Sequence, residues 1–145
     1  MIRLEPFEPQ HISSLSAPRN DVQLYPLLCT GEYQEVLYRA GNAYSAWVPE
    51  GLLGCAGIGL RPDGYPEAWL IGSPLIDRYK VGFHRLVRRM LKTLQEVNGW
   101  KTVLSTTSVD DARARAWIEA LGFKRVGTVT APGVPGTYFR YIKEY

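Results

Sequence analysis

The chain has 145 residues, of which 46% are hydrophobic and 21% charged, and its formal net charge is +3. This is the length and composition of about one ordinary globular domain, which excludes disorder, collagen and coiled coil as descriptions of the whole chain. The sequence has no run of roughly 18 apolar residues, no signal-peptide pattern, and too few cysteines for a disulfide framework. We therefore expect a cytoplasmic protein with one domain over residues 1–145.

The first half of the chain predicts a helical region followed by an antiparallel meander. A strand at residues 2–4 and a helical turn at residues 9–15 come first. A helix is then expected at residues 21–39, where Pro26 and Gly31 interrupt the apolar spacing and can divide it in two. Three strand-like runs follow, each closed by a turn that contains proline: residues 43–48, 52–60 and 67–72.

The second half alternates helices and strands. Apolar residues recur at the spacing of one helix face and predict an amphipathic helix at residues 82–97. A strand at residues 102–106 precedes a second helix at residues 109–121, for which Ser108 is the expected N-terminal cap. Asp111 follows three residues later in the spacing of a capping box, so helix capping is an alternative role for its side chain. Two final strands are expected at residues 123–130 and 137–142. This element order predicts an α/β fold with a mixed sheet.

The net charge hides an uneven distribution. Residues 1–72 carry four basic and eight acidic side chains, whereas residues 73–145 carry thirteen basic and six acidic ones. Such asymmetry is typical of a protein with an anionic partner, and a basic surface that is merely solvated has the same signature. Six of the thirteen basic residues lie in one loop and helix: Arg78, Lys80, Arg85, Arg88, Arg89 and Lys92.

The loop at residues 74–81 and the helix that follows it are candidates for an anion site. The first turn of a helix offers free backbone amides and a partial positive charge, which suit a phosphate group. Arg78, Lys80 and Arg85 lie nearest to this turn, and anion binding explains them as well as solvation does. Solvation is the simpler explanation for the other three, which share the polar face of the helix.

Three segments resemble the GNAT family of N-acyltransferases. Residues 67–74 are similar to the family's fourth strand, residues 78–87 to its acyl-coenzyme A pyrophosphate loop, and residues 109–123 to a helix that ends in Leu-Gly-Phe. The resemblance implies a GNAT-like α/β fold with a mixed, mostly antiparallel central sheet of about six to seven strands flanked by helices. It also implies transfer of an acetyl group from acetyl-coenzyme A to an unknown amine.

The resemblance further implies roles for individual residues. Glu67 would act as the general base that takes a proton from the amine, and Ser73 would contact a ligand or a water. Acetyl-coenzyme A would be held by residues of the fourth strand, the loop and the two helices: Ile71, Arg78, Lys80, Gly82, Arg85 and Asp111. No metal is expected, because His11 and His84 are not in ligand spacing with a cysteine or a carboxylate.

Two features depart from the family pattern, the loop and the tyrosine of the last helix. The family's loop reads Arg/Gln-x-x-Gly-x-Gly/Ala, and here Val81 and Phe83 replace the two small residues while Gly82 lies one place out of register. In many members a tyrosine of the last helix protonates the leaving thiolate. Its position falls on Ile118, with Trp117 beside it, and neither side chain can donate a proton to sulfur in that role.

These departures leave alternatives open. The first is an active acyltransferase. The second is a GNAT-fold protein without activity that serves as a binding component, as in small phage-encoded GNAT-like proteins associated with the virion. The third is a nucleic-acid-binding module that uses the basic half, although no single-strand-binding motif is visible. The expected partners are acyl-coenzyme A and an amine, with copies of the chain or virion proteins as further candidates, rather than a membrane or a nucleic acid.

Overall fold

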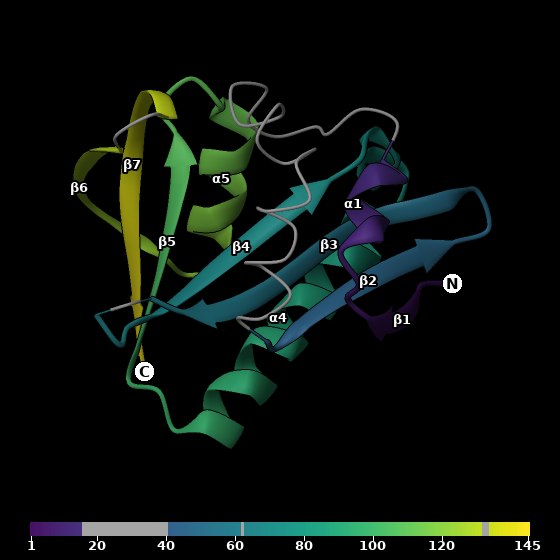
Figure 1. Cartoon of the computed structure of the whole chain (residues 1–145), viewed down its shortest axis with the longest axis horizontal. Coiled ribbons are helices and arrows are strands. Elements are labelled where there is room, and N and C mark those ends of the chain that lie inside the picture. The colour runs from purple at the N-terminus through teal and green to yellow at the C-terminus, as the bar shows by residue number, and fades with distance from the viewer. Residues whose placement is uncertain (16–40, 62, 132–133) are drawn as a thin grey trace.

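The computed structural model describes residues 1–15, 41–61, 63–131 and 134–145. These residues form a seven-stranded sheet with the order β1-β2-β3-β4-β5-β7-β6 (Figure 1). Neighbouring strands are antiparallel except for β4 and β5, so the predicted mixed, mostly antiparallel sheet is confirmed. The strands are β1 (Arg3–Pro6), β2 (Ala43–Val48), β3 (Gly51–Leu60), β4 (Pro66–Gly72), β5 (Thr102–Ser108), β6 (Lys124–Ala131) and β7 (Val134–Glu144).

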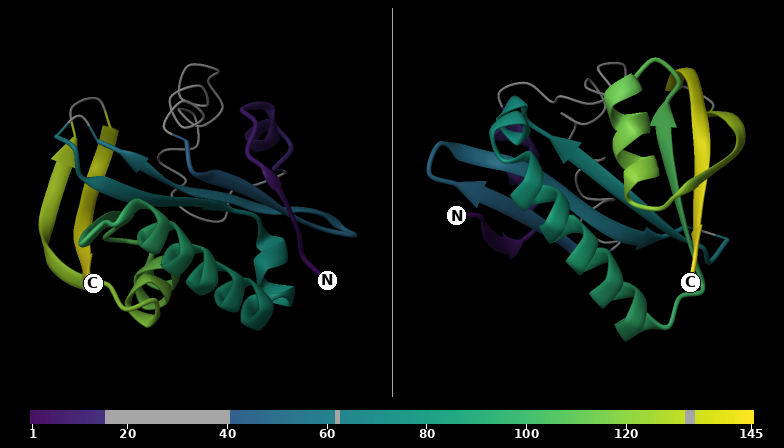
Figure 2. Two further views of the ribbon diagram at one scale, coloured as in Figure 1. Left: turned by 90° about the horizontal axis from the view of Figure 1, so that it is seen from below. Right: turned by 180° about the vertical axis from the view of Figure 1, so that it is seen from behind.

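Helices lie on both faces of this sheet, as Figure 2 shows. The short helix α1 (Gln10–Ser13) is on one face, whereas α4 (Lys80–Asn98) and α5 (Ala112–Ala120) pack together on the other. The 3-10 helix η1 (Pro74–Arg78) connects β4 to α4. The helix predicted at residues 21–39 lies outside the described residues. Among the described helices, none combines the length and the apolar character of a membrane-crossing segment.

The apolar stripe predicted for α4 is the face that this helix turns toward the sheet. Phe83, Leu91 and Leu94 are buried there. The helix begins at Lys80, two residues before the predicted start, because η1 leads directly into it. It ends before Gly99, whose φ of 69° is left-handed and whose amide donates to the carbonyl of Gln95 at 2.8 Å.

The predicted cap of α5 is wrong. Ser108 belongs to β5, where it pairs with Tyr138, and its hydroxyl accepts a hydrogen bond from the amide of Asp110 at 3.3 Å. Asp111 caps the helix instead, because its carboxylate accepts the amide of Ala114 at 3.0 Å. The pairing of β5 with β7 therefore extends to Ser108 and moves the start of α5 three residues beyond its predicted position.

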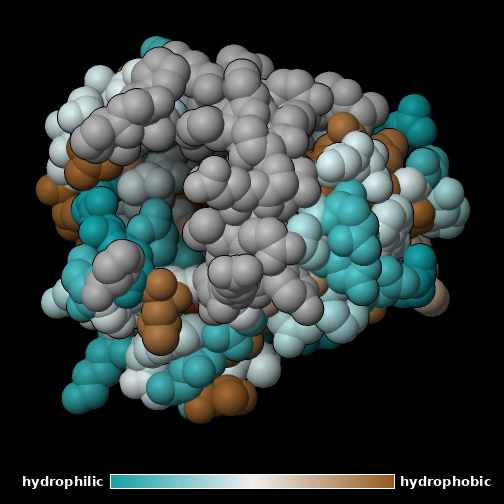
Figure 3. Space-filling view, viewed as in Figure 1, coloured by the Kyte–Doolittle hydropathy of each residue, from teal (hydrophilic) through white to brown (hydrophobic). Residues whose placement is uncertain are grey.

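The apolar core lies on both sides of the sheet. On the α1 side of the sheet, Phe7 and Ile12 pack against Leu52, Cys55 and Ile71 of β3 and β4. Beneath α4 and α5, the core includes the fully buried Val103 and Tyr141, with residues of both helices. On the face shown in Figure 3, the described hydrophobic residues lie in small separate groups among hydrophilic ones.

The parallel strands β4 and β5 diverge from a common base. Of the described strand pairs, this one has a single registered pair of residues, Glu67 with Leu104. The hydroxyl of Ser105 adds a hydrogen bond to the carbonyl of Ala68 at 3.0 Å. Beyond this point the two strands separate toward the end at which α4 and α5 begin (Figure 1). The divergence places the end of β4 beside both helix N-termini.

Candidate functional site

A cleft of about 570 Å³ lies where the end of β4 meets the first halves of α4 and α5. Four of the described cationic side chains line it, three from α4 and one from α5: Lys80, Arg85, Arg88 and Arg113. Lys80, His84 and Arg88 follow one another at intervals of four residues, which places them on one face of α4. The cleft therefore offers concentrated positive charge to a ligand.

The first turn of α4 adds backbone donors to this charge. The amide of Phe83 donates to the carbonyl of Tyr79 at 2.8 Å, which is the first hydrogen bond of the helix. The amides of Lys80, Val81 and Gly82 come before it and have no partner within the helix. All three residues are exposed, so an anion can reach these donors and the positive end of the helix dipole.

Phe83 stands where the family has a small residue, and its side chain turns away from the exposed first turn. The ring is 3% exposed and packs with Leu53 and Ile76 in the core. It contributes to the inner wall of the cleft. The loss of the small residue thus leaves the first-turn amides accessible.

Trp117 of α5 forms the facing part of the inner wall. Its ring stacks on Phe83, with the centroids 6.0 Å apart and the planes at 19°. The indole Nε1 donates a hydrogen bond to Nδ1 of His84 at 3.0 Å. Because Nδ1 accepts, the neutral imidazole carries its proton on Nε2, which can donate to a ligand in the cleft. Ile118, at the family's tyrosine position, is buried in the core.

Two carboxylates moderate the positive charge of the cleft. Asp111 lines it while capping α5. Arg113 forms an ion pair with Asp77 of η1, and this pair joins the beginning of α5 to η1. An incoming phosphate would compete with Asp77 for the guanidinium.

Five of the six predicted coenzyme residues line one of two neighbouring spaces, and the sixth, Ile71, lines neither. Lys80, Arg85 and Asp111 line the cleft. Arg78 and Gly82, with Arg85, line a neighbouring depression beside the N-terminal residues Met1 and Ile2. The side chain of Arg78 is 72% exposed and lies 3.9 Å from a carboxylate oxygen of Glu50.

Tyr79 ties the same glutamate to the start of α4. Its hydroxyl donates to the Glu50 carboxylate at 2.7 Å. This hydrogen bond raises the pKa of Tyr79 and lowers the pKa of Glu50. The contact joins the loop before β3 to the segment between η1 and α4, next to the first-turn amides.

Ile71 and Ser73 are buried at the end of β4. Ile71 packs in the core on the α1 side of the sheet. The hydroxyl of Ser73 lies 3.0 and 3.1 Å from the carbonyls of Leu52 and Leu53, and it accepts the amide of Leu75 at 3.3 Å. In the structure this hydroxyl caps η1 and holds it against β3.

Glu67 lies at the base of the divergence between β4 and β5. Side chains alternate along a strand, so Glu67 is on the same face as Ile71, the α1 side of the sheet. Its carboxylate is 3.4 Å from the guanidinium of Arg61, which also lies 3.2 Å from Asp63. The structure does not bring Glu67 into the cationic cleft.

The sequence did not single out Arg113 or the contact between Trp117 and His84. The spacing of Lys80, His84 and Arg88 was a signal for a shared helix face. Nothing comparable marks Trp117 and His84, which are 33 positions apart and meet because α4 and α5 pack together. Among the described residues, no group of histidine, cysteine, aspartate and glutamate is arranged to hold a metal.

Proteins of known structure share this architecture. No protein-family model and no curated protein sequence matches the chain. Solved structures do match. They include a GNAT-family acetyltransferase from Bacillus anthracis (14% identity, TM-score 0.70, 99% of this chain and 94% of that one). They also include a chimeric spermidine N-acetyltransferase from Vibrio cholerae (14%, 0.71, 99% and 95%) and an acetyltransferase from Bacillus subtilis in complex with CoA (14%, 0.70, 100% and 99%). The chain therefore has the fold of the GNAT-family acetyltransferases, as its sequence segments indicated.

Proposed function

We propose that the protein binds an acyl-coenzyme A in the cationic cleft and transfers its acyl group to an amine. The observation that carries this proposal is the first turn of α4, whose three leading amides have no partner within the helix and which borders a cleft lined by four cationic side chains. A pyrophosphate is the ligand group that such an arrangement suits. The fold supports the same conclusion, because a protein of this fold was solved with coenzyme A.

The groups around the first turn of α4 would each bind a particular part of the acyl-coenzyme A. The amides of Lys80, Val81 and Gly82 would bind the pyrophosphate oxygens, as at other helix N-termini. Lys80, Arg85 and Arg88 would add charge-assisted hydrogen bonds, and Nε2 of His84 would add a neutral donor. The pantetheine arm would then lead inward, past the end of β4, toward the divergence between β4 and β5.

The proposed reaction joins the acyl carbon to the amine nitrogen. The nitrogen attacks the thioester carbonyl, the C–N bond forms, the C–S bond breaks, and coenzyme A leaves as a thiolate. The amine loses one proton to a base, and the thiolate gains one from solvent. Glu67 is the candidate base, and its carboxylate lies 3.4 Å from the guanidinium of Arg61. Holding the two reactants together would supply a large part of the acceleration.

Binding of coenzyme A tests the proposal. A ligand at 100 times its Kd should raise the free energy of unfolding by about 2.7 kcal/mol, which thermal unfolding detects. The double variant Lys80→Ala, Arg85→Ala should bind more weakly by a factor of ten or more, because each charge-assisted hydrogen bond contributes about 1.5–3 kcal/mol. Lys92→Ala is the matched control, since Lys92 is on α4 but does not line the cleft. Absence of any shift at millimolar coenzyme A would contradict the proposal.

A binding protein without transferase activity is the second candidate. It is favoured by Ile118, which is buried where the family's proton-donating tyrosine would be, and by Ser73, whose hydroxyl is held between backbone groups. Such a protein would act by binding, in a phage virion or elsewhere. Release of free thiol from acetyl-coenzyme A, measured with and without spermidine or an N-terminal peptide, separates the two candidates. Amine-dependent release that Glu67→Gln abolishes supports the transferase, whereas binding without release supports the second candidate.

A further inference from the structure

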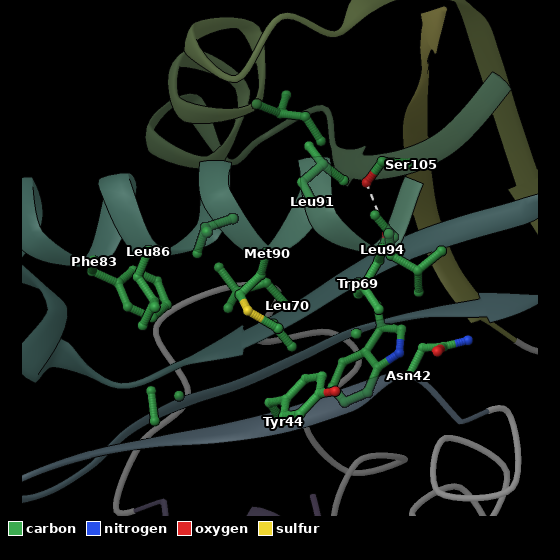
Figure 4. A pocket seen from close by; sticks show the side chains of 18 of the residues that line it. Asn42, Tyr44, Trp69, Leu70, Phe83, Leu86, Met90, Leu91, Leu94 and Ser105 are labelled. Atoms are coloured by element: carbon green, nitrogen blue, oxygen red, sulfur yellow. Dashed lines mark hydrogen bonds between the residues drawn. The ribbon is translucent and has the colours of Figure 1, made fainter. Parts of the chain in front are cut away.

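A second cavity, of about 110 Å³, lies behind the cleft between the sheet and α4 (Figure 4). Its floor includes small residues from β2, β3 and β4, namely Ala46, Gly54, Ala56 and Ala68, beside the larger Tyr44, Ile58 and Leu70. Its roof is made of longer apolar side chains from α4: Leu86, Met90, Leu91 and Leu94. The space is not sealed from solvent, since Ala56, Ala68 and Leu86 in its lining are partly exposed.

The cavity exists because the floor residues are too small to meet the roof. Gly54 has no room for a side chain, since a Cβ there would lie 2.9 Å from the carbonyl oxygen of Ile71. Ala56 and Ala68 stop short of α4. Opposite them, Leu86 and Met90 remain half-buried although they face the sheet.

The cavity and the cationic cleft share a wall. Leu70, Phe83 and Trp117 line both spaces. Phe83 lies at one end of the cavity, and the polar residues Asn42 and Ser105 lie toward the other (Figure 4). A pantetheine arm that runs from the first turn of α4 past the end of β4 would therefore pass along the wall that the cleft shares with this cavity.

We infer that this cavity takes the acyl chain of an acyl-coenzyme A longer than acetyl, an inference that rests on the proposed function. The lining is apolar, and the hydroxyl of Ser105 is already bonded to the carbonyl of Ala68, so the cavity suits hydrocarbon. An apolar cavity of about 150 Å³ binds benzene. By that measure the space holds a chain of about four to six carbons. The stacked rings of Phe83 and Trp117 would flank its entrance.

A chain-length series tests the inference on the full chain. The affinities of coenzyme A and its acetyl, butyryl, hexanoyl and decanoyl thioesters would be measured by titration calorimetry. Each methylene buried in the cavity should raise affinity by up to about fourfold. The hexanoyl thioester should therefore bind about tenfold or more tightly than the acetyl one, whereas the decanoyl thioester should gain nothing further.

Filling the cavity should remove the gain. Ala68→Leu and Ala56→Leu place a larger side chain on the floor, and two such variants guard against one that fails to fold. Each should bind acetyl-coenzyme A as the unmodified protein does and lose the preference for hexanoyl. Ala120→Leu is the matched control, because Ala120 is exposed on α5 and lines neither space. This variant should keep the preference.

The outcomes separate the two proposals. If neither coenzyme A nor any thioester binds, both are overturned. If coenzyme A and acetyl-coenzyme A bind but affinity does not rise with chain length, the acyl-chain inference is overturned and the proposed function stands. The inference is also overturned if the hexanoyl preference survives in both filled variants, because the chain then binds elsewhere.

Discussion

At the scale of single residues, Cys55 is buried in a small polar network on the α1 side of the sheet. Its thiol lies 3.4 Å from the hydroxyl of Ser45, which in turn lies 2.7 Å from Nδ1 of His11. The thiol and the hydroxyl are both fully buried. Burial raises the pKa of Cys55 from its ordinary value of 9.0 to about 11, because the thiolate is poorly solvated there, and the bond to Ser45 offsets only part of this.

Because the pKa of Cys55 is raised, the free energy of unfolding should change with pH in the alkaline range. The folded protein binds the thiol proton more tightly than the unfolded chain does, so the stabilisation is complete below pH 9 and is lost between about pH 9 and 11. Two units correspond to roughly 2.7 kcal/mol of unfolding free energy. Lysines and tyrosines titrate in the same range, so the measurement is the difference between the protein and Cys55→Ala in urea unfolding. That difference should fall by up to this amount between pH 8 and 11, and a constant difference would contradict the prediction.

Residue types predicted the cleft more successfully than they predicted the role of each side chain. The basic residues near one helix start predicted an anion site, and four of the described cationic side chains line a cleft beside that turn. Ser73 and Ile71 received ligand roles from their place in the strand. Whether a hydroxyl is free depends on the carbonyls of Leu52 and Leu53, which approach only in the folded sheet. The local sequence does not indicate which distant strands pair, so it could not predict these contacts.

At the scale of elements, α5 depends on one capping side chain. Asp111 accepts the amide of Ala114, and loss of an N-terminal cap costs about 1 kcal/mol, within a range of about 0.5–2 kcal/mol. Asp111→Ala should lower the free energy of unfolding by this amount. Asp111→Asn keeps an acceptor of similar quality and should be nearly neutral for stability. Asp110→Ala, at the exposed neighbouring position, is the control, and an equal loss in that variant would refute the cap.

The same variants separate the two roles of Asp111. Its carboxylate lines the cationic cleft, so it opposes a phosphate there while it stabilises the helix. Asp111→Asn removes the negative charge without removing the cap. Coenzyme A should therefore bind this variant as tightly as the unmodified protein or more tightly, whereas a residue that held the coenzyme would bind it less tightly when changed.

Helices with a strong hydrophobic periodicity were predicted correctly, whereas the residues at which elements begin were predicted less well. The apolar spacing of α4 indicated both the helix and its buried face. The start of α5 was wrong because Ser108 and Asp111 are both good caps, and the choice between them is made by β7. The pairs Thr107 with Phe139 and Ser108 with Tyr138 extend β5 to the point where Asp111 becomes the cap. Tertiary pairing thus overrode the local signal.

At the scale of the whole molecule, the acidic and the basic half of the sequence form different parts of the fold. The acidic first half contributes β1 to β4, whereas the basic second half contributes both helices that border the cleft. Lys92 extends the basic face of α4 beyond the cleft, with its side chain 76% exposed. Such outlying charges act on an approaching anion at a distance, while those inside the cleft act on it once bound.

This division predicts that charge inside and outside the cleft will affect different rate constants. The association rate of coenzyme A, followed by stopped flow, should fall as salt rises, because screening shortens the reach of surface charge to about 10 Å at 0.1 M. Lys92→Glu should lower the association rate at low salt and leave dissociation unchanged, and the difference should vanish at high salt. Arg88→Ala, inside the cleft, should instead raise the dissociation rate at every salt concentration. An association rate that does not change with salt concentration would contradict this prediction and would mean that the basic half is only a solvated surface.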